Sequence, residues 1–148
     1  QQDYRWHFWA RVWRQPRLGE LAMLLMGVPW LGKAMFSAAL RSGGPGLSQR
    51  QITDAYRRFT PSVRQQALQL YRATDPGNFA GWETRMLVVT AEHPTLVLWG
   101  QRDPFIATRY ADRFGASKVE RFNEAGHWVV VEAADRVAPL IDAHLCDS

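Results

Sequence analysis

The sequence predicts an α/β fold in which a helical N-terminal part precedes a short parallel sheet. Strand candidates occur only near the C-terminus, chiefly at residues 95–99 and 118–122, and a helix candidate at residues 107–114 separates them. A strand, a helix and a second strand in that order form a parallel pair, because the connection has to cross back over the sheet. The chain before these strands has apolar residues at helical spacing instead, so we expect two domains, residues 1–77 and 78–148.

The N-terminal part is expected to contain five helices, at residues 3–15, 18–26, 30–40, 49–59 and 61–73. Proline and glycine separate these segments. Ser48 and Pro61 stand where the N-cap of the fourth helix and the first turn of the fifth are predicted. Trp6, Trp9 and Trp13 form one stripe on the first helix, and such a stripe is typical of a face that packs into a core.

Composition excludes several classes of site. The chain has 148 residues, of which 47% are hydrophobic, which is enough for a sizeable core. A single cysteine, Cys146, excludes an internal disulfide and a cysteine-based metal cluster, and the four histidines lack the spacing of a metal-binding motif. No apolar run is long enough to span a membrane and no signal-peptide pattern is found, so we expect a cytoplasmic protein.

Charge is distributed unevenly along the chain. Residues 1–85 contain 12 lysines and arginines against 5 acidic residues, whereas residues 86–148 contain 6 against 9. An isoelectric point near 9.7 is typical of proteins that bind nucleic acid or an anionic surface. The arginines are dispersed over helical segments without a basic run, however, which favours a solvated helical face. We therefore expect neither nucleic acid nor a membrane as a partner.

One acid and one histidine follow the two predicted strands. Asp103 comes just after the first strand and the glycine that ends it, and His127 comes after the second strand. Open α/β sheets carry their ligand-binding and catalytic side chains at the carboxyl ends of the strands. A histidine can take up and return a proton near neutral pH, and a carboxylate behind it can fix its tautomer. The two residues are therefore candidates for an acid and base pair.

The segments PTLVLWGQRDPF and GHWVVVEAADRV resemble the last two strand-and-loop units of the α/β-hydrolase superfamily, in particular its cap-bearing members. In that family a catalytic triad runs in the chain order nucleophile, acid, histidine. The resemblance makes Asp103 the triad acid and His127 the triad base. The 24 positions that separate them leave room for one helix and one strand, as the family arrangement requires.

The family's nucleophile is missing from the chain. It would lie on a G-x-S-x-G elbow, or on an Asp or Cys equivalent, between a strand and a helix upstream of the acid. None of the six serines stands in such a motif, nor does Cys146. The oxyanion hole, which the family builds from the residue after the nucleophile and an earlier loop, is absent for the same reason. We expect the chain to be the C-terminal part of a larger hydrolase whose N-terminal part supplies the nucleophile.

The resemblance also implies a role for each domain. Residues 1–77 become a helical cap, or lid, and residues 78–148 become the last strand-helix units of the hydrolase core, with the N-terminal sheet strands missing. A turn at residues 75–78 returns the chain from cap to core. Residues 79–91 are assigned to a helix, because the family has one before its seventh strand. The last helix, residues 133–145, is expected to face the core with Val137, Leu140, Ile141 and His144.

Aromatic side chains near the expected triad indicate an apolar substrate. Phe105 and Trp128 flank the acid and the histidine in sequence, and Trp9 in the cap is a candidate for the roof of the pocket. The segment LQLYR, residues 68–72, resembles a cap segment of epoxide hydrolases. Tyr71 falls on the position of the tyrosine that donates a proton in those enzymes. Those enzymes use a second cap tyrosine, and Val12 stands at its position here, so Tyr71 is expected to pack or to line the pocket.

The reaction subclass stays open. The many tryptophans suit a haloalkane dehalogenase, and an esterase, a lactonase or a carbon–carbon bond hydrolase fits the visible residues equally well. No organic or metal cofactor is expected, because a triad supplies its own acid and base. The expected partners are a small, apolar ester, epoxide or similar molecule and the missing N-terminal part of the hydrolase core.

Two other classes of function are compatible with the sequence. A hydrolase-derived protein without catalytic activity could bind another chain through its basic helical part, and His127→Ala would then change no activity. A module for membrane surfaces or nucleic acid could use the helix that is rich in tryptophan and arginine, and its binding would weaken steeply with salt.

Overall fold

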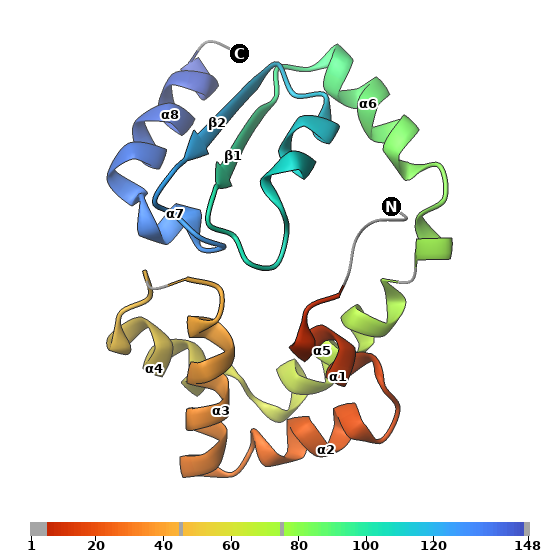
Figure 1. Cartoon of the computed structure of the whole chain (residues 1–148), viewed down its shortest axis with the longest axis vertical. Helices are drawn as coiled ribbons and strands as arrows, with labels where there is room; N and C mark the ends of the chain where they lie inside the picture. The colour runs from red at the N-terminus through yellow and green to blue at the C-terminus, as the bar shows by residue number, and fades with distance from the viewer. Residues whose placement is uncertain (1–5, 45, 75, 147–148) are drawn as a thin grey trace. The chain divides into compact units, whose positions relative to one another are not determined.

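The computed structural model describes residues 6–44, 46–74 and 76–146 and shows a mixed α/β chain that is mostly helical (Figure 1). The chain divides into two compact units. The first comprises Gln1–Ser42 and Ser48–Phe79, and the second comprises Gly43–Leu47 and Ala80–Ser148. The first unit ends at Phe79 and the second continues from Ala80, whereas the sequence predicts a boundary after residue 77. The loop Gly43–Leu47 is assigned to the second unit, although the sequence prediction places it in the first domain.

The first unit contains helices alone among its described residues. They are α1 (Phe8–Arg14), α2 (Leu18–Leu25), α3 (Pro29–Arg41), α4 (Gln49–Arg58), α5 (Pro61–Ala73) and the 3₁₀ turn η1 (Pro76–Phe79). Each of the five expected helices is present. The first is shorter than expected, because the ring of His7 accepts a hydrogen bond from the N–H of Ala10 and starts the helix at Phe8. Its expected residues 3–5 lie outside the described residues, and Trp6 precedes the helix.

A small core of methionine and leucine joins these helices. Met23, Met26 and Leu68 are buried, and five partly buried side chains pack against them: Trp9, Trp13, Met35, Phe59 and Ala67. The helix pairs in contact are α1 with α2, α1 with α5, α2 with α5, and α3 with α4. The guanidinium of Arg72 on α5 binds both carboxylate oxygens of Glu20 on α2, at 2.6 and 2.9 Å. This hydrogen bonding lowers the pKa of Glu20 to about 2.

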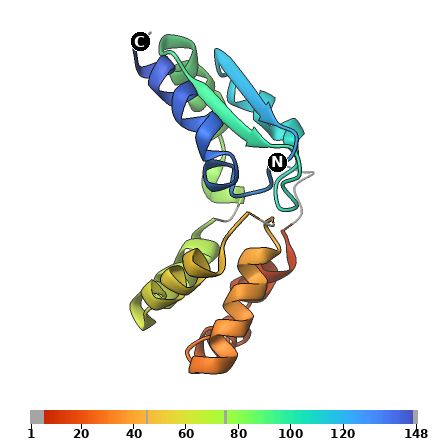
Figure 2. The same cartoon turned by 90° about the vertical axis from the view of Figure 1, so that its left-hand side faces the viewer.

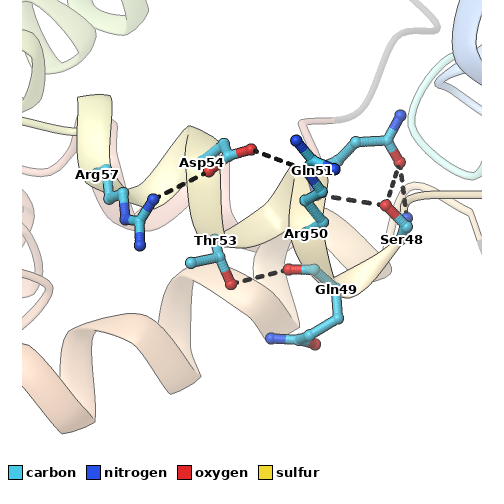
Figure 3. Close-up of polar contacts among 7 residues, drawn as sticks. All are labelled: Ser48, Gln49, Arg50, Gln51, Thr53, Asp54 and Arg57. Carbon is cyan, nitrogen blue, oxygen red and sulfur yellow. Dashed lines mark hydrogen bonds and ion pairs between the residues drawn. The ribbon is translucent and has the colours of Figure 1, made fainter.

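Helix α4 shows how local sequence defines a helix start (Figure 3). The hydroxyl of Ser48 accepts a hydrogen bond from the N–H of Gln51, and the side-chain oxygen of Gln51 accepts one from the N–H of Ser48 at 2.8 Å. This reciprocal arrangement is a capping box, which satisfies two N–H groups that a helix start leaves without partners. The predicted N-cap at Ser48 is confirmed.

The second unit contains all the described strands. Its elements are α6 (Trp82–Glu92), β1 (Leu96–Gly100), the 3₁₀ helix η2 (Thr108–Phe114), β2 (Lys118–Phe122), α7 (Val129–Glu132) and α8 (Ala134–Cys146). Three details differ from the sequence prediction. Gly100 is the last paired residue of β1 rather than the residue that stops it. The connection between the strands is a 3₁₀ helix, a form common in short connections, and Gly115 with φ 62° ends it. The short helix α7 was not expected.

The two strands are parallel, as the strand, helix and strand order predicts, and their register runs from Leu96 opposite Lys118 to Gly100 opposite Phe122. Helices α8 and η2 lie on opposite sides of this sheet (Figures 1 and 2). The core on the α8 side consists of five buried residues, Phe122, Ala125, Val129, Ala133 and Val137, with Leu98 and Leu140 packed against them. This core holds α7 and the loop after β2 against the sheet.

One core assignment on the last helix is wrong. Val137 is buried and Leu140 packs against the core, as expected, but Ile141 is 37% exposed. Ile141 belongs to neither buried cluster, since the packed stripe of α8 runs through Val137 and Leu140, and His144 is half-buried.

No single helix in the described residues is both long and apolar enough to cross a membrane. Helices α2 and α3 reach the length and composition only when taken together, and the chain bends by 113° between them.

Replacing Val137 by alanine should destabilise the protein by about 2 kcal/mol, since it removes two buried methyl groups and leaves a cavity in the core under α8. The matched control is Val130→Ala on α7, where the side chain is 60% exposed. That variant should stay within about 0.5 kcal/mol of the parent protein. Urea unfolding measures both values, and equal losses for the two variants would contradict the assigned core.

Candidate active site

The loops that follow β1 and β2 lie side by side. Residues after β1 donate backbone hydrogen bonds to the end of β2 and to the loop beyond it, from Gln101 to Phe122 at 3.0 Å and from Arg102 to Ala125 at 2.9 Å. The N–H of Asp103 turns back to the carbonyl of Gly100 at 3.2 Å. This turn places the side chain of Asp103 beside the second loop.

Glycine allows a very close backbone approach at this edge of the sheet. A Cβ atom on Gly100 would overlap the carbonyl group of Gly126, and a Cβ atom on Gly126 would lie 2.5 Å from the carbonyl oxygen of Gly43. Three backbone segments therefore meet where only glycine fits. His127 directly follows this contact.

Asp103 and His127 form a direct hydrogen bond. The distance from His127 Nδ1 to Asp103 Oδ2 is 2.9 Å, and the side chains are 32% and 8% exposed, respectively. Because a carboxylate only accepts hydrogen bonds, the proton of a neutral His127 resides on Nδ1. The other ring nitrogen, Nε2, is then the basic atom, and no hydrogen bond to it is found among the described residues.

The second oxygen of Asp103 is held by the backbone. Oδ1 accepts hydrogen bonds from the N–H of Phe105 at 2.8 Å and from the N–H of Ile106 at 3.1 Å. Burial by itself raises the pKa of Asp103, but the hydrogen bonds from His127 and from these two N–H groups outweigh it, so the pKa lies below its ordinary value. The carboxylate is therefore ionised at neutral pH and fixed in orientation.

Two aromatic rings contact the imidazole, and a backbone carbonyl holds the main chain of His127. The rings of Phe105 and Trp128 each stand at 76° to the ring of His127, with centroids 5.0 Å away. The backbone N–H of His127 donates to the carbonyl of Gly43 at 2.7 Å. The structure thus brings together four of the six site residues that the sequence suggests.

The other two suggested residues, Trp9 and Tyr71, lie in the first unit. Both pack against Trp13, with ring centroids 6.1 Å from Trp9 and 4.8 Å from Tyr71. Burial raises the pKa of Tyr71. The two side chains form part of the aromatic packing between α1 and α5, and their contact with a substrate stays a prediction.

No nucleophile lies beside the imidazole in the described part of the second unit. Ser117 precedes the amino end of β2 and bonds to Thr95, while His127 follows the carboxyl end of that strand. Cys146 is exposed at the last turn of α8. Among the described residues, no group of three or more histidine, cysteine or acidic side chains could hold a metal ion.

Two contributors to this site were not found from the sequence. Gly43 lies in a glycine and proline segment that predicts only a loop. Glu132, whose carboxylate accepts the backbone N–H of Gly126, lies in a segment where no helix was expected. The sequence signals that could have pointed to them are the glycines before Ser48, for Gly43, and the position of an acid five residues after His127, for Glu132. Their meaning depends on contacts between distant parts of the chain.

No protein-family model matches the chain, and no solved structure matches it. Among curated proteins, the chain is similar to one from Pseudomonas putida that is described as the dihydrolipoyllysine-residue acetyltransferase component of the acetoin cleaving system. The two sequences are 33% identical over 95 residues, which cover 63% of this chain and only 25% of that relative's length. A functional assignment therefore rests on the geometry of Asp103 and His127.

Proposed function

We propose that this chain carries the acid and the base of an α/β-hydrolase catalytic triad. The observation that supports this is the hydrogen bond from His127 Nδ1 to Asp103 Oδ2, made at the carboxyl ends of two adjacent parallel strands. In this proposal the second unit is the last part of the hydrolase core, and the five helices of the first unit are its cap.

The two side chains have distinct roles in the reaction. Nε2 of His127 takes the proton from the nucleophile, or from the hydrolytic water, and returns it to the leaving group. Asp103 holds Nδ1–H and stabilises the imidazolium that forms, without becoming protonated itself. Its lowered pKa suits this role, because the residue must stay charged throughout the cycle.

The nucleophile comes from a segment outside this chain in our proposal. In the part of the chain that the structure describes, β1 pairs only with β2, so its other edge lacks a neighbouring strand. Helix α6, which packs on η2, also exposes large apolar side chains: Trp82 is 57% exposed, and Val88 and Val89 are each 55% exposed. An unpaired strand edge and an uncovered apolar helix are what a sheet without its remaining strands would present.

The substrate class follows from the surroundings of the imidazole. The aromatic rings of Phe105 and Trp128 each lie with their centroids 5.0 Å from the ring of His127, so a small apolar ester, epoxide or similar molecule would find contact area next to the base.

A second candidate is a hydrolase-derived protein that binds a partner chain without catalysis. The exposed apolar side chains of α6 favour it, because a partner could cover them as well as a missing strand could. The two candidates differ in whether His127 is needed for turnover.

Replacing His127 by alanine in the protein as its gene produces it should lower kcat at least about 100-fold, because the base is lost. The assay uses a panel of small apolar probes, namely 4-nitrophenyl butyrate, styrene oxide and 1-bromobutane. The control is His93→Ala, at the exposed C-cap of α6, which should keep the parent rate. Unchanged turnover in the His127 variant, or a parent protein inactive on the whole panel, would favour the partner-binding candidate.

The contribution of Asp103 to stability should depend on pH. Its pKa in the folded protein is below the ordinary 3.8, so the ionised form stabilises the fold above that pH and the contribution disappears as pH falls through the folded value. The difference in unfolding free energy between the parent and Asp103→Asn should therefore narrow in acid. Urea unfolding at a series of pH values measures it. A difference that stays constant or widens below pH 3.8 would contradict the proposed state of the carboxylate.

Replacing both Phe105 and Trp128 by alanine should lower kcat/KM for 4-nitrophenyl butyrate roughly 10-fold more than for 4-nitrophenyl acetate, because the longer chain loses more apolar contact. The comparison of two esters with one leaving group keeps the chemistry constant. Equal losses for the two esters would argue against an apolar binding surface at these rings.

A further inference from the structure

Glu132 joins the histidine loop to the glycine loop of the second unit. One oxygen, Oε2, accepts a hydrogen bond from the N–H of Gly126, and the other, Oε1, accepts one from the N–H of Gly46 at 3.2 Å. The two donors are 80 residues apart in sequence, and Gly126 is the residue just before His127. A single carboxylate therefore binds two segments that are distant in sequence, in addition to the backbone hydrogen bond from His127 to Gly43.

The glycine loop is shaped to admit this carboxylate. A Cβ atom on Gly44 or on Gly46 would overlap the side chain of Glu132, and Gly44 has φ 148°, a conformation that favours glycine. At the start of the same loop, the carbonyl of Gly43 accepts the N–H of His127. The loop and the histidine segment are thus connected at both ends of the contact.

The helix that carries Glu132 is itself fixed. Helix α7 is buried through Val129, which is 9% exposed, and it continues into Ala133, which is 7% exposed, and both belong to the core under α8. The helix that carries the carboxylate is consequently fixed by the core. Its two hydrogen bonds hold Gly126, and with it the backbone of His127, in a defined position.

We infer that Glu132 is a positioning residue, which sets the backbone of Gly126 and His127 so that Nδ1 of the histidine faces Asp103. This inference rests on the proposed hydrolase function for its catalytic meaning, but the geometry that it concerns does not. Both carboxylate oxygens are required, since each accepts from a different segment. A side chain with one acceptor oxygen cannot replace it.

The test is Glu132→Gln in the full protein, read by NMR without any substrate. The amide retains the size of the side chain but offers one acceptor oxygen, so the N–H of Gly126 or of Gly46 loses its partner. We expect the hydrogen exchange of whichever of the two amides, Gly126 or Gly46, loses its acceptor to accelerate at least about 10-fold. We also expect the downfield Nδ1–H signal of ¹⁵N-labelled His127 to broaden or move upfield.

Two further variants separate position from charge and from folding. Glu124→Gln removes a charge from an exposed residue that lines the same cavity of about 360 Å³ as Glu132, and it should leave both signals unchanged. Glu132→Asp keeps the charge but shortens the side chain by one methylene group. It should show the same faster amide exchange and the same change in the Nδ1–H signal as Glu132→Gln. It also serves as the test variant if Glu132→Gln does not fold.

The outcomes are distinct. Parent-like exchange at both Gly126 and Gly46, or a parent-like Nδ1–H signal, in a folded Glu132 variant would overturn the inference, as would equal changes in Glu124→Gln. If the positioning is also used in catalysis, Glu132→Gln lowers kcat about 10-fold to 100-fold with little change in KM. If the protein has no hydrolase activity, the NMR results still decide whether Glu132 positions His127, so a failure of the proposed function is recognised separately.

Discussion

The parallel pairing of β1 with β2 is the constraint on which the candidate site depends. The register sets Gly100 opposite Phe122, so both strands end at the same level and the loops that follow begin side by side. Backbone hydrogen bonds between these loops and the absence of a Cβ atom on Gly100 allow them to approach closely. The hydrogen bond between Asp103 and His127 is a consequence of this backbone arrangement, because each side chain follows one of the two strand ends.

The side chain of Asp103 is only 8% exposed, so its charged carboxylate needs hydrogen-bond donors from the protein. Removing such a group from water is costly unless hydrogen bonds replace the lost hydration. Asp103 has three donors, one from His127 and two from the backbone N–H groups of Phe105 and Ile106. These donors keep the acid charged and immobile, while His127 retains more exposure and a free nitrogen for proton transfer. The site thus combines a fixed charge with an accessible base.

The loop Gly43–Leu47 contributes to the candidate site although it lies between helices of the first unit in sequence. It connects two helices of the first unit, yet its own contacts are with the second unit. Its glycines leave room for the carboxylate of Glu132 and for the ring of Trp128, which lies against Gly43. The glycines of this loop allow close approach between backbone segments and side chains. A loop that served only as a flexible linker would not make such contacts.

Local sequence patterns determined most of the elements. The helix starts at Ser48 and Pro61 depend only on neighbouring residues, and β1 is a short apolar run. These elements could be predicted from local sequence, together with a second strand at residues 118–122 and the positions of Asp103 and His127 after the strands. Tertiary structure alone decided the rest: which nitrogen of His127 faces the acid, the place of Gly43 beside it, and the bridging position of Glu132. These features depend on contacts between residues far apart in the chain. Local propensity and periodicity act over a few residues and carry no information about such contacts.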